Sequence, residues 1–119
     1  MRPLNRGVYM DLKPIAKNYF ETFSKKDSQG LKNLFSEDVS LRDWEIQANG
    51  KKDVLAANQK IFDGVKSIQV NPVSMYQEGN TVLSELEILI DQTTKLLVLD
   101  IIDFDTNHKI KAVRAFKGN

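Results

Sequence analysis

The first half of the chain carries apolar residues at helical spacing. A helix over residues 12–25 is predicted by side chains that recur three or four positions apart, namely Leu12, Ile15, Ala16, Tyr19, Phe20 and Phe23. A third helix is predicted over residues 52–62 by the same periodicity. Between them, a short second helix should present on one side Leu31, Leu34 and Phe35.

Five further segments, most of them in the second half of the chain, alternate between apolar and polar residues. Val39 and Leu41 predict a short strand that ends near Asp43 and Trp44. Four further strands are predicted over residues 67–76, 81–91, 95–105 and 110–116. Pro72 in the first of these four favours an edge strand or a bulge. Helices followed by consecutive strands are typical of an α+β fold, with the helices on one face of a mostly antiparallel sheet.

Bulk properties narrow the class of protein. The 119 residues are enough for one domain, and we expect residues 1–10 to form a loose arm and residues 11–119 to form the domain. The 17 Lys and Arg residues nearly balance the 16 Asp and Glu residues, so charge gives no reason to expect binding to nucleic acid or to a membrane. Because there is no cysteine and no apolar run of signal-peptide or membrane-spanning length, we expect a cytoplasmic protein.

The strand around residues 96–104 is apolar on both of its faces. Val98 and Ile102 alternate with Leu97, Leu99 and Ile101. One face should cover the core, whereas the other would be exposed in a monomer, and a large exposed apolar face usually marks an interface. We therefore predict a homodimer that forms through the outer face of the sheet.

Three polar residues are candidates for chemistry. Asp100 shares a face with Val98 and Ile102, where an ionised carboxylate is unfavourable. It either reaches solvent or a cationic partner, or it stays protonated with a raised pKa and donates a hydrogen bond to a developing oxyanion. Tyr19, on the apolar side of the first helix, either fills the core or offers a buried hydroxyl. Asp43 is either a solvated turn residue or a member of the same site.

Around these residues the chain resembles ketosteroid isomerases and the wider SnoaL-like group of the nuclear-transport-factor-2-like superfamily. The resemblance is carried by residues 19–23, 34–39, 43, 50, 100–104 and 109–116. It implies a cone-shaped, cystatin-like roll in which three helices and a curved sheet surround a ligand pocket. In ketosteroid isomerases a tyrosine and an aspartic acid stabilise an enolate while an aspartate base moves a proton. These three residues align with Tyr19, Asp100 and Asp43.

The resemblance also implies an apolar pocket for a small hydrophobic carbonyl compound, with no cofactor. We expect no metal site, because His108 is the only histidine. The expected substrate-binding residues are Phe20, Phe35, Trp44, Asn58, Phe62, Leu86, Ile88, Val98 and Ile102, with Leu12, Ile15 and Val54 in the same wall. Two positions depart from the family pattern. Trp44 follows the base where proline is common, and Asn58 falls where some members place a supporting aromatic hydroxyl.

Other functions stay open at this point. A SnoaL-like polyketide cyclase or dehydratase would rely on Asp100 as its acid–base residue, and an epoxide-hydrolase-type site would need an arginine, such as Arg114, between two carboxylates. A small-ligand-binding domain without catalysis would use Tyr19 and Asp100 as a hydrogen-bonded pair inside the core.

Overall fold

The computed structural model describes residues 10–118. The helices and strands follow in the order α1 (Lys13–Ser24), α2 (Ser28–Leu34), β1 (Phe35–Arg42), β2 (Gln47–Asn49), α3 (Lys51–Asp63), β3 (Ile68–Glu78), β4 (Thr81–Ile90), β5 (Thr94–Phe104) and β6 (Ile110–Lys117). All three predicted helices and all five predicted strands are present, and β2 is an addition to them. Of the predicted N-terminal arm, residues 1–9 lie outside the described residues.

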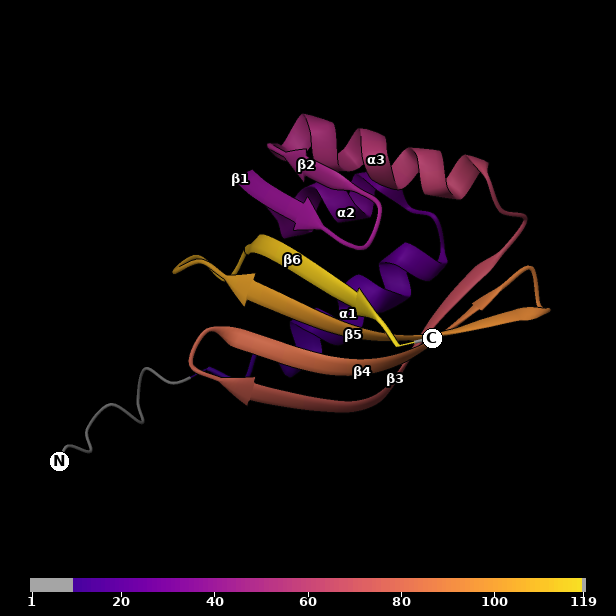
Figure 1. Cartoon of the computed structure of the whole chain (residues 1–119). Coiled ribbons are helices and arrows are strands. Elements are labelled where there is room, and N and C mark those ends of the chain that lie inside the picture. The colour runs from indigo at the N-terminus through magenta and orange to yellow at the C-terminus, as the bar shows by residue number, and fades with distance from the viewer. Residues whose placement is uncertain (1–9, 119) are drawn as a thin grey trace, which may run out of the picture.

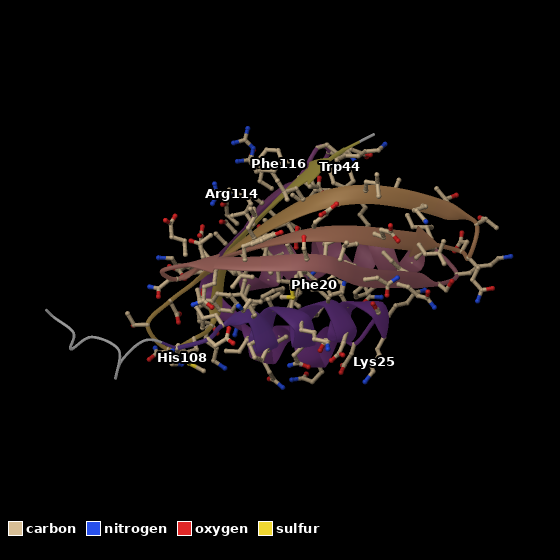
Figure 2. The ribbon with its side chains drawn as sticks, turned by 90° about the horizontal axis from the view of Figure 1, so that it is seen from below. Phe20, Lys25, Trp44, His108, Arg114 and Phe116 are labelled. Atoms are coloured by element: carbon tan, nitrogen blue, oxygen red, sulfur yellow. The ribbon has the colours of Figure 1, made fainter. Side chains whose placement is uncertain are left out.

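The six strands form one sheet in the order β2-β1-β6-β5-β4-β3. Neighbouring strands are antiparallel, except that β1 and β6 are parallel. The sheet curves around α1, and α3 runs beside the β1–β2 edge (Figure 1). Seen from below, α1 covers one face of the sheet (Figure 2). The predicted α+β fold, with three helices packed on a curved, mostly antiparallel sheet, is therefore confirmed.

The first strand begins earlier than its alternating residues predict. Phe35 was expected on the second helix, but its backbone is extended and it pairs with Ile110 of β6. This pairing joins segments far apart in the sequence, so local spacing does not reveal it. The additional strand β2 is only three residues long and pairs with β1, where Ser40 faces Asn49. Pro72 is placed as predicted, because β3 is an edge strand whose register with β4 shifts between Pro72 and Ser74.

Two contacts hold α3 in place beside the sheet. Gly50, which precedes α3, has a φ of 90°, a conformation that favours glycine, and its N–H donates to the carbonyl oxygen of Val39 in β1 at 2.7 Å. At the other end of α3, the Nζ of Lys26 donates to the carbonyl oxygens of Phe62 at 2.9 Å and Val65 at 2.6 Å. The corner between α1 and α2 is thereby tied to the end of α3. These contacts position two helices around the space that the sheet encloses.

The two faces of β5 differ in burial as the alternation predicts. Val98, Asp100 and Ile102 are buried on the inner face. On the outer face, Leu97 is 41 % exposed and Leu99 is 40 % exposed. The exposed apolar face is thus present, and the homodimer inferred from it stays a prediction. Across residues 10–118, no helix is both long enough and apolar enough to cross a membrane.

Candidate active site

A cavity of about 340 Å³ lies between α1, α3 and the inner face of the sheet. Its wall is mostly apolar, with polar side chains contributed by Tyr19, Asp43, Glu45, Asn58, Asp100 and Lys117. Trp44, Glu45 and Lys117 are exposed and mark the mouth, where β1 and β6 end. The volume and the few polar groups suit a small, largely apolar ligand.

Tyr19 lies in the middle of α1 with its side chain turned toward the sheet. The side chain is buried, and its ring packs against the rings of Phe20 at 5.5 Å, Phe23 at 6.1 Å and Phe35 at 6.0 Å between centroids. No hydrogen bond joins its hydroxyl to another residue in the described part of the chain, although Tyr19 lines the cavity. Burial, and then the negative charge of Asp100, raise the pKa of the Tyr19 phenol. The hydroxyl therefore keeps its proton and can donate it in a hydrogen bond to a ligand.

Asp100 lies on the inner face of β5 and is only 6 % exposed. Its neighbours in register are Ser84 of β4 and Ala115 of β6. Within residues 10–118, neither a cation nor a hydrogen-bond donor pairs with its carboxyl group. Burial, followed by the negative charge of Asp43, raises the pKa of Asp100 to about 7. Its protonated form, which donates a hydrogen bond, is therefore well populated near neutral pH.

Asp43 lies at the mouth, in the loop between β1 and β2. Its Oδ1 accepts hydrogen bonds from the backbone N–H groups of Glu45 at 2.7 Å and Ile46 at 2.6 Å, and its own N–H donates to the Ile46 carbonyl oxygen at 2.9 Å. These bonds fix the half-buried carboxylate in a tight turn. In the described part of the chain no hydrogen bond engages Oδ2, so this oxygen is available to a ligand in the cavity.

The structure brings most of the predicted site residues to one cavity. Tyr19, Asp43 and Asp100 all line it, although they come from α1, the β1–β2 loop and β5. The predicted substrate-binding residues that also line it are Phe20, Trp44, Asn58, Leu86, Ile88 and Val98. Phe20 lies between the sheet and α1, whereas Trp44 lies at the far edge of the sheet (Figure 2).

Three predicted substrate-binding residues do not line the cavity. The ring of Phe35 packs behind Tyr19, and the ring of Phe62 packs against Phe23 at 4.8 Å, so both phenylalanines fill core behind the wall. Ile102 pairs with residues 82 and 113 on the neighbouring strands, further along β5 than the cavity reaches. The prediction was wrong for these residues because an inward-facing apolar side chain can serve either the core or the cavity. The same correction applies to the other wall residues that were expected, Leu12, Ile15 and Val54.

Sequence reasoning missed other residues of the wall. They are Phe23, Leu41, Glu45, Ile46, Ile61, Ile68, Val70, Ile90, Leu96, Val113, Ala115 and Lys117. Some of them could have been found from the sequence, because residues two positions apart in a strand share a face. Leu96 shares a face with Val98, and Lys117 shares a face with Ala115. Nothing in the spacing indicates Glu45 or Ile46, which reach the cavity through the turn at Asp43.

Two alternative arrangements that the sequence left open, the Arg114 bridge between carboxylates and the Tyr19–Asp100 hydrogen bond, are absent from the described residues. Arg114 does not line the cavity. It is exposed, its guanidinium lies 3.4 Å from the Asp103 carboxylate, and it lies on the side of the sheet away from α1 (Figure 2). An epoxide-hydrolase-type bridge through Arg114 is therefore wrong. Tyr19 and Asp100 form no hydrogen bond with each other or with other residues of the described chain, so they are not the satisfied core pair that a purely structural role would require.

The fold and the cavity together define a small α+β domain with a largely apolar cavity, and the family comparison agrees with this class. The family model of the SnoaL-like domain matches residues 16–113, so the chain belongs to the SnoaL-like family. Among curated proteins, none matches the chain significantly.

Solved structures share the fold at low sequence identity. A candidate SnoaL-like polyketide cyclase from Shewanella denitrificans superposes with a TM-score of 0.80 at 16% identity, covering 89% of each chain. A candidate ketosteroid isomerase from Kribbella flavida gives a TM-score of 0.76 at 16% identity, covering 91% of this chain and 78% of its own. An epoxide hydrolase from Mycobacterium tuberculosis gives 0.74 at 12% identity, covering 86% of this chain and 78% of its own. At such identities the likeness establishes the fold, and the activities are those of the other proteins.

Proposed function

We propose that this protein is an enzyme that shifts a proton next to a carbonyl group, in the manner of ketosteroid isomerase. The observation that carries the proposal is the convergence of Tyr19, Asp43 and Asp100 on one cavity. An enzyme of this kind requires a base that is ionised and donors that keep their protons. The buried phenol of Tyr19 and the buried carboxyl group of Asp100 are suited to the donor role because their pKa values are raised. Asp43, which is held in its turn by two backbone N–H groups, is the base in this proposal.

The proposed reaction begins with the carboxylate of Asp43. Its Oδ2 takes a proton from the carbon next to the substrate carbonyl, and the electrons of that C–H bond move onto the carbonyl oxygen to give an enolate. The Tyr19 hydroxyl and the protonated Asp100 carboxyl donate hydrogen bonds to this oxygen as its charge develops. Asp43 then returns the proton to a different carbon of the conjugated system, and the enzyme regains its starting state.

The substrate in this proposal is a small, hydrophobic β,γ-unsaturated ketone. The cavity of about 340 Å³ has a mostly apolar wall, to which Phe20, Leu86 and Val98 contribute. Apolar contact would hold the carbon skeleton, while the polar groups orient the carbonyl. Trp44 is 41 % exposed at the mouth and would cover the bound molecule.

The experiment that tests the proposal follows the conversion of β,γ-unsaturated ketones to their conjugated isomers by ultraviolet absorbance. A steroidal ketone and a small cyclic one would be compared, with wild type beside Asp43→Asn. We expect turnover by wild type, and a loss of about 10²–10⁴-fold in Asp43→Asn, because the amide cannot accept the proton. Asp38→Asn is the matched control, since Asp38 is an exposed aspartate on β1 outside the cavity. Equal activity of Asp43→Asn and wild type would overturn the proposal.

One observation favours a second candidate function, an acid–base reaction of the polyketide-cyclase type centred on Asp100. A carboxyl group with a pKa of about 7 is well suited to exchange protons at neutral pH. The pH profile separates the two candidates. If Asp100 acts as a neutral donor, the rate should fall as the pH rises through about 7, whereas a rate that depends on ionised Asp100 as base should rise over the same range.

We also propose that the protein is cytoplasmic. A further proposal is that it forms a homodimer through the outer face of the sheet. Leu97, Leu99 and Phe116 are exposed on neighbouring strands, where Leu99 faces Phe116 in register. Light scattering should show that wild type is a dimer and that Leu99→Asp is a monomer, because a second copy cannot bury a carboxylate there without cost. Lys17→Glu, on the exposed side of α1, should leave the dimer intact.

A further inference from the structure

The cavity contains a buried amide that the proposed reaction does not use. Asn58 lies on the inner side of α3, one turn after Val54 and one turn before Phe62, and it is only 1 % exposed. Its side chain lines the cavity. Its Nδ2 is fully buried and has no hydrogen-bond partner within the described chain.

An unpaired buried amide is unfavourable, and leucine has nearly the same shape without that disadvantage. Packing alone therefore does not explain an asparagine at this position. By the sequence resemblance, Asn58 falls where some family members place a supporting aromatic hydroxyl, so a contact with Tyr19 is one explanation to consider. The structure does not provide that contact, because no hydrogen bond joins Asn58 to Tyr19. The Nδ2 donor of this cavity-lining residue is thus left without a partner in the described chain.

We infer that Asn58 is a substrate-recognition residue, and that the substrate carries a second oxygen that accepts a hydrogen bond from its Nδ2. This inference rests on the proposed function, because Tyr19 and Asp100 are taken to hold the reacting carbonyl. Asn58 comes from α3, whereas those donors come from α1 and β5. The inferred substrate is therefore an apolar ketone that carries a second oxygen, from a keto, ester or carboxylate group, on the side of the molecule that faces α3.

The donor character of Nδ2 makes the inference specific. An amide N–H₂ group donates and does not accept, so it favours an oxygen with a free lone pair over an alkyl group of the same size. Another buried polar atom, Ser84 Oγ, also has no partner, but Ser84 does not line the cavity. Ser84→Ala is therefore a matched control for the removal of an unpaired buried polar group.

The test measures binding and does not require turnover. The probes are 2-naphthols, whose phenol mimics an enolate, with an acetyl group at different ring positions, each paired with the isopropyl analogue of the same shape. Affinities would be measured by titration calorimetry with wild type, Asn58→Leu, Asn58→Asp and Ser84→Ala. Thermal unfolding would verify that each variant is folded.

We expect wild type to bind at least one acetyl probe about five- to tenfold more tightly than its isopropyl partner, which corresponds to one ordinary hydrogen bond. Asn58→Leu should abolish this preference, and Ser84→Ala should keep it. Asn58→Asp should reverse it at a pH at which the introduced carboxyl group is ionised, because a carboxylate repels the acetyl oxygen. The inference is overturned if no acetyl probe is preferred by wild type, if Asn58→Leu keeps the preference, or if no naphthol binds. A preference for acetyl without isomerase turnover would overturn the proposed reaction and leave the recognition role standing.

Discussion

At the inner end of the cavity, Asp100 lies on a strand among apolar side chains and has no hydrogen-bond partner in the described chain, whereas at the mouth Asp43 lies in a loop and accepts two backbone N–H bonds. Burial raises the pKa of Asp100 to about 7. In the loop, two backbone N–H groups hold Oδ1 of Asp43, and within the described residues no hydrogen bond engages its Oδ2. One residue type thus occupies two different environments in the same cavity, and the buried one raises the pKa of the carboxyl group that it surrounds.

The largest effect that this comparison predicts is on stability. The folded pKa of Asp100 is about 7 and its ordinary value is 3.8, so between these values the folded state binds more protons than the unfolded state. The contribution of neutral Asp100 is therefore complete below pH 3.8 and is lost as the pH rises to about 7. Relative to Asp100→Asn, which does not titrate, wild type should lose about 4 kcal/mol of unfolding free energy over that range.

Urea unfolding of wild type and Asp100→Asn at several pH values between about 4 and 8 measures this difference. Parallel stability profiles of the two proteins would mean that Asp100 is not a buried acid. The comparison between the two ends of the cavity would then fail.

The next largest effect concerns the hydroxyl of Tyr19. Tyr19→Phe should lower the rate of ketone isomerisation by about 10²–10³-fold, because one oxyanion donor is removed. It should leave the free energy of unfolding nearly unchanged, since the hydroxyl has no partner within the described residues to lose. Steady-state kinetics and urea unfolding of the same preparation separate the two effects. A large loss of stability would show that the hydroxyl has a structural role instead.

The smallest effect is the electrostatic coupling between the two ends of the cavity. The negative charge of Asp43 contributes to the raised pKa of Asp100, after burial. Asp43→Asn should therefore lower the pKa of Asp100 and move the fall in stability to lower pH. Carbon-13 chemical shifts of the Asp100 carboxyl group, followed against pH, would measure this change. An unchanged pKa would mean that the two carboxylates do not sense one another.

Much of the fold could be predicted because local rules applied. The helical spacing from Leu12 to Phe23 and the alternation along residues 96–104 both report on neighbours within one element. The early start of β1 at Phe35 could not be predicted, because it depends on pairing with Ile110 in the last strand. The strand β2 was missed for a different reason, because three residues carry too little pattern.

Some features of the candidate site can be recognised in the sequence, and others only in the tertiary structure. The isolated carboxyl of Asp100 between Val98 and Ile102 is visible in the sequence, and so is the position of Tyr19 on an apolar helix face. The sequence also shows that Asn58 has an inward spacing with Val54 and Phe62. The unpaired state of its Nδ2 becomes visible only when the groups from other elements are in place.

The amino-acid sequence by itself determined the family, the order of the three helices and of five of the six strands, and the inward sides of the longer elements. These properties follow from residue spacing, which acts over a few positions. Only the tertiary structure decided that Phe35, Phe62 and Ile102 fill the core while Phe23 and Leu96 line the cavity. Apolar side chains leave water in either place, so burial alone does not distinguish them. An inward-facing residue lines the cavity only where the curved strands and the helices leave an unfilled space beside it, and that space depends on the tertiary structure.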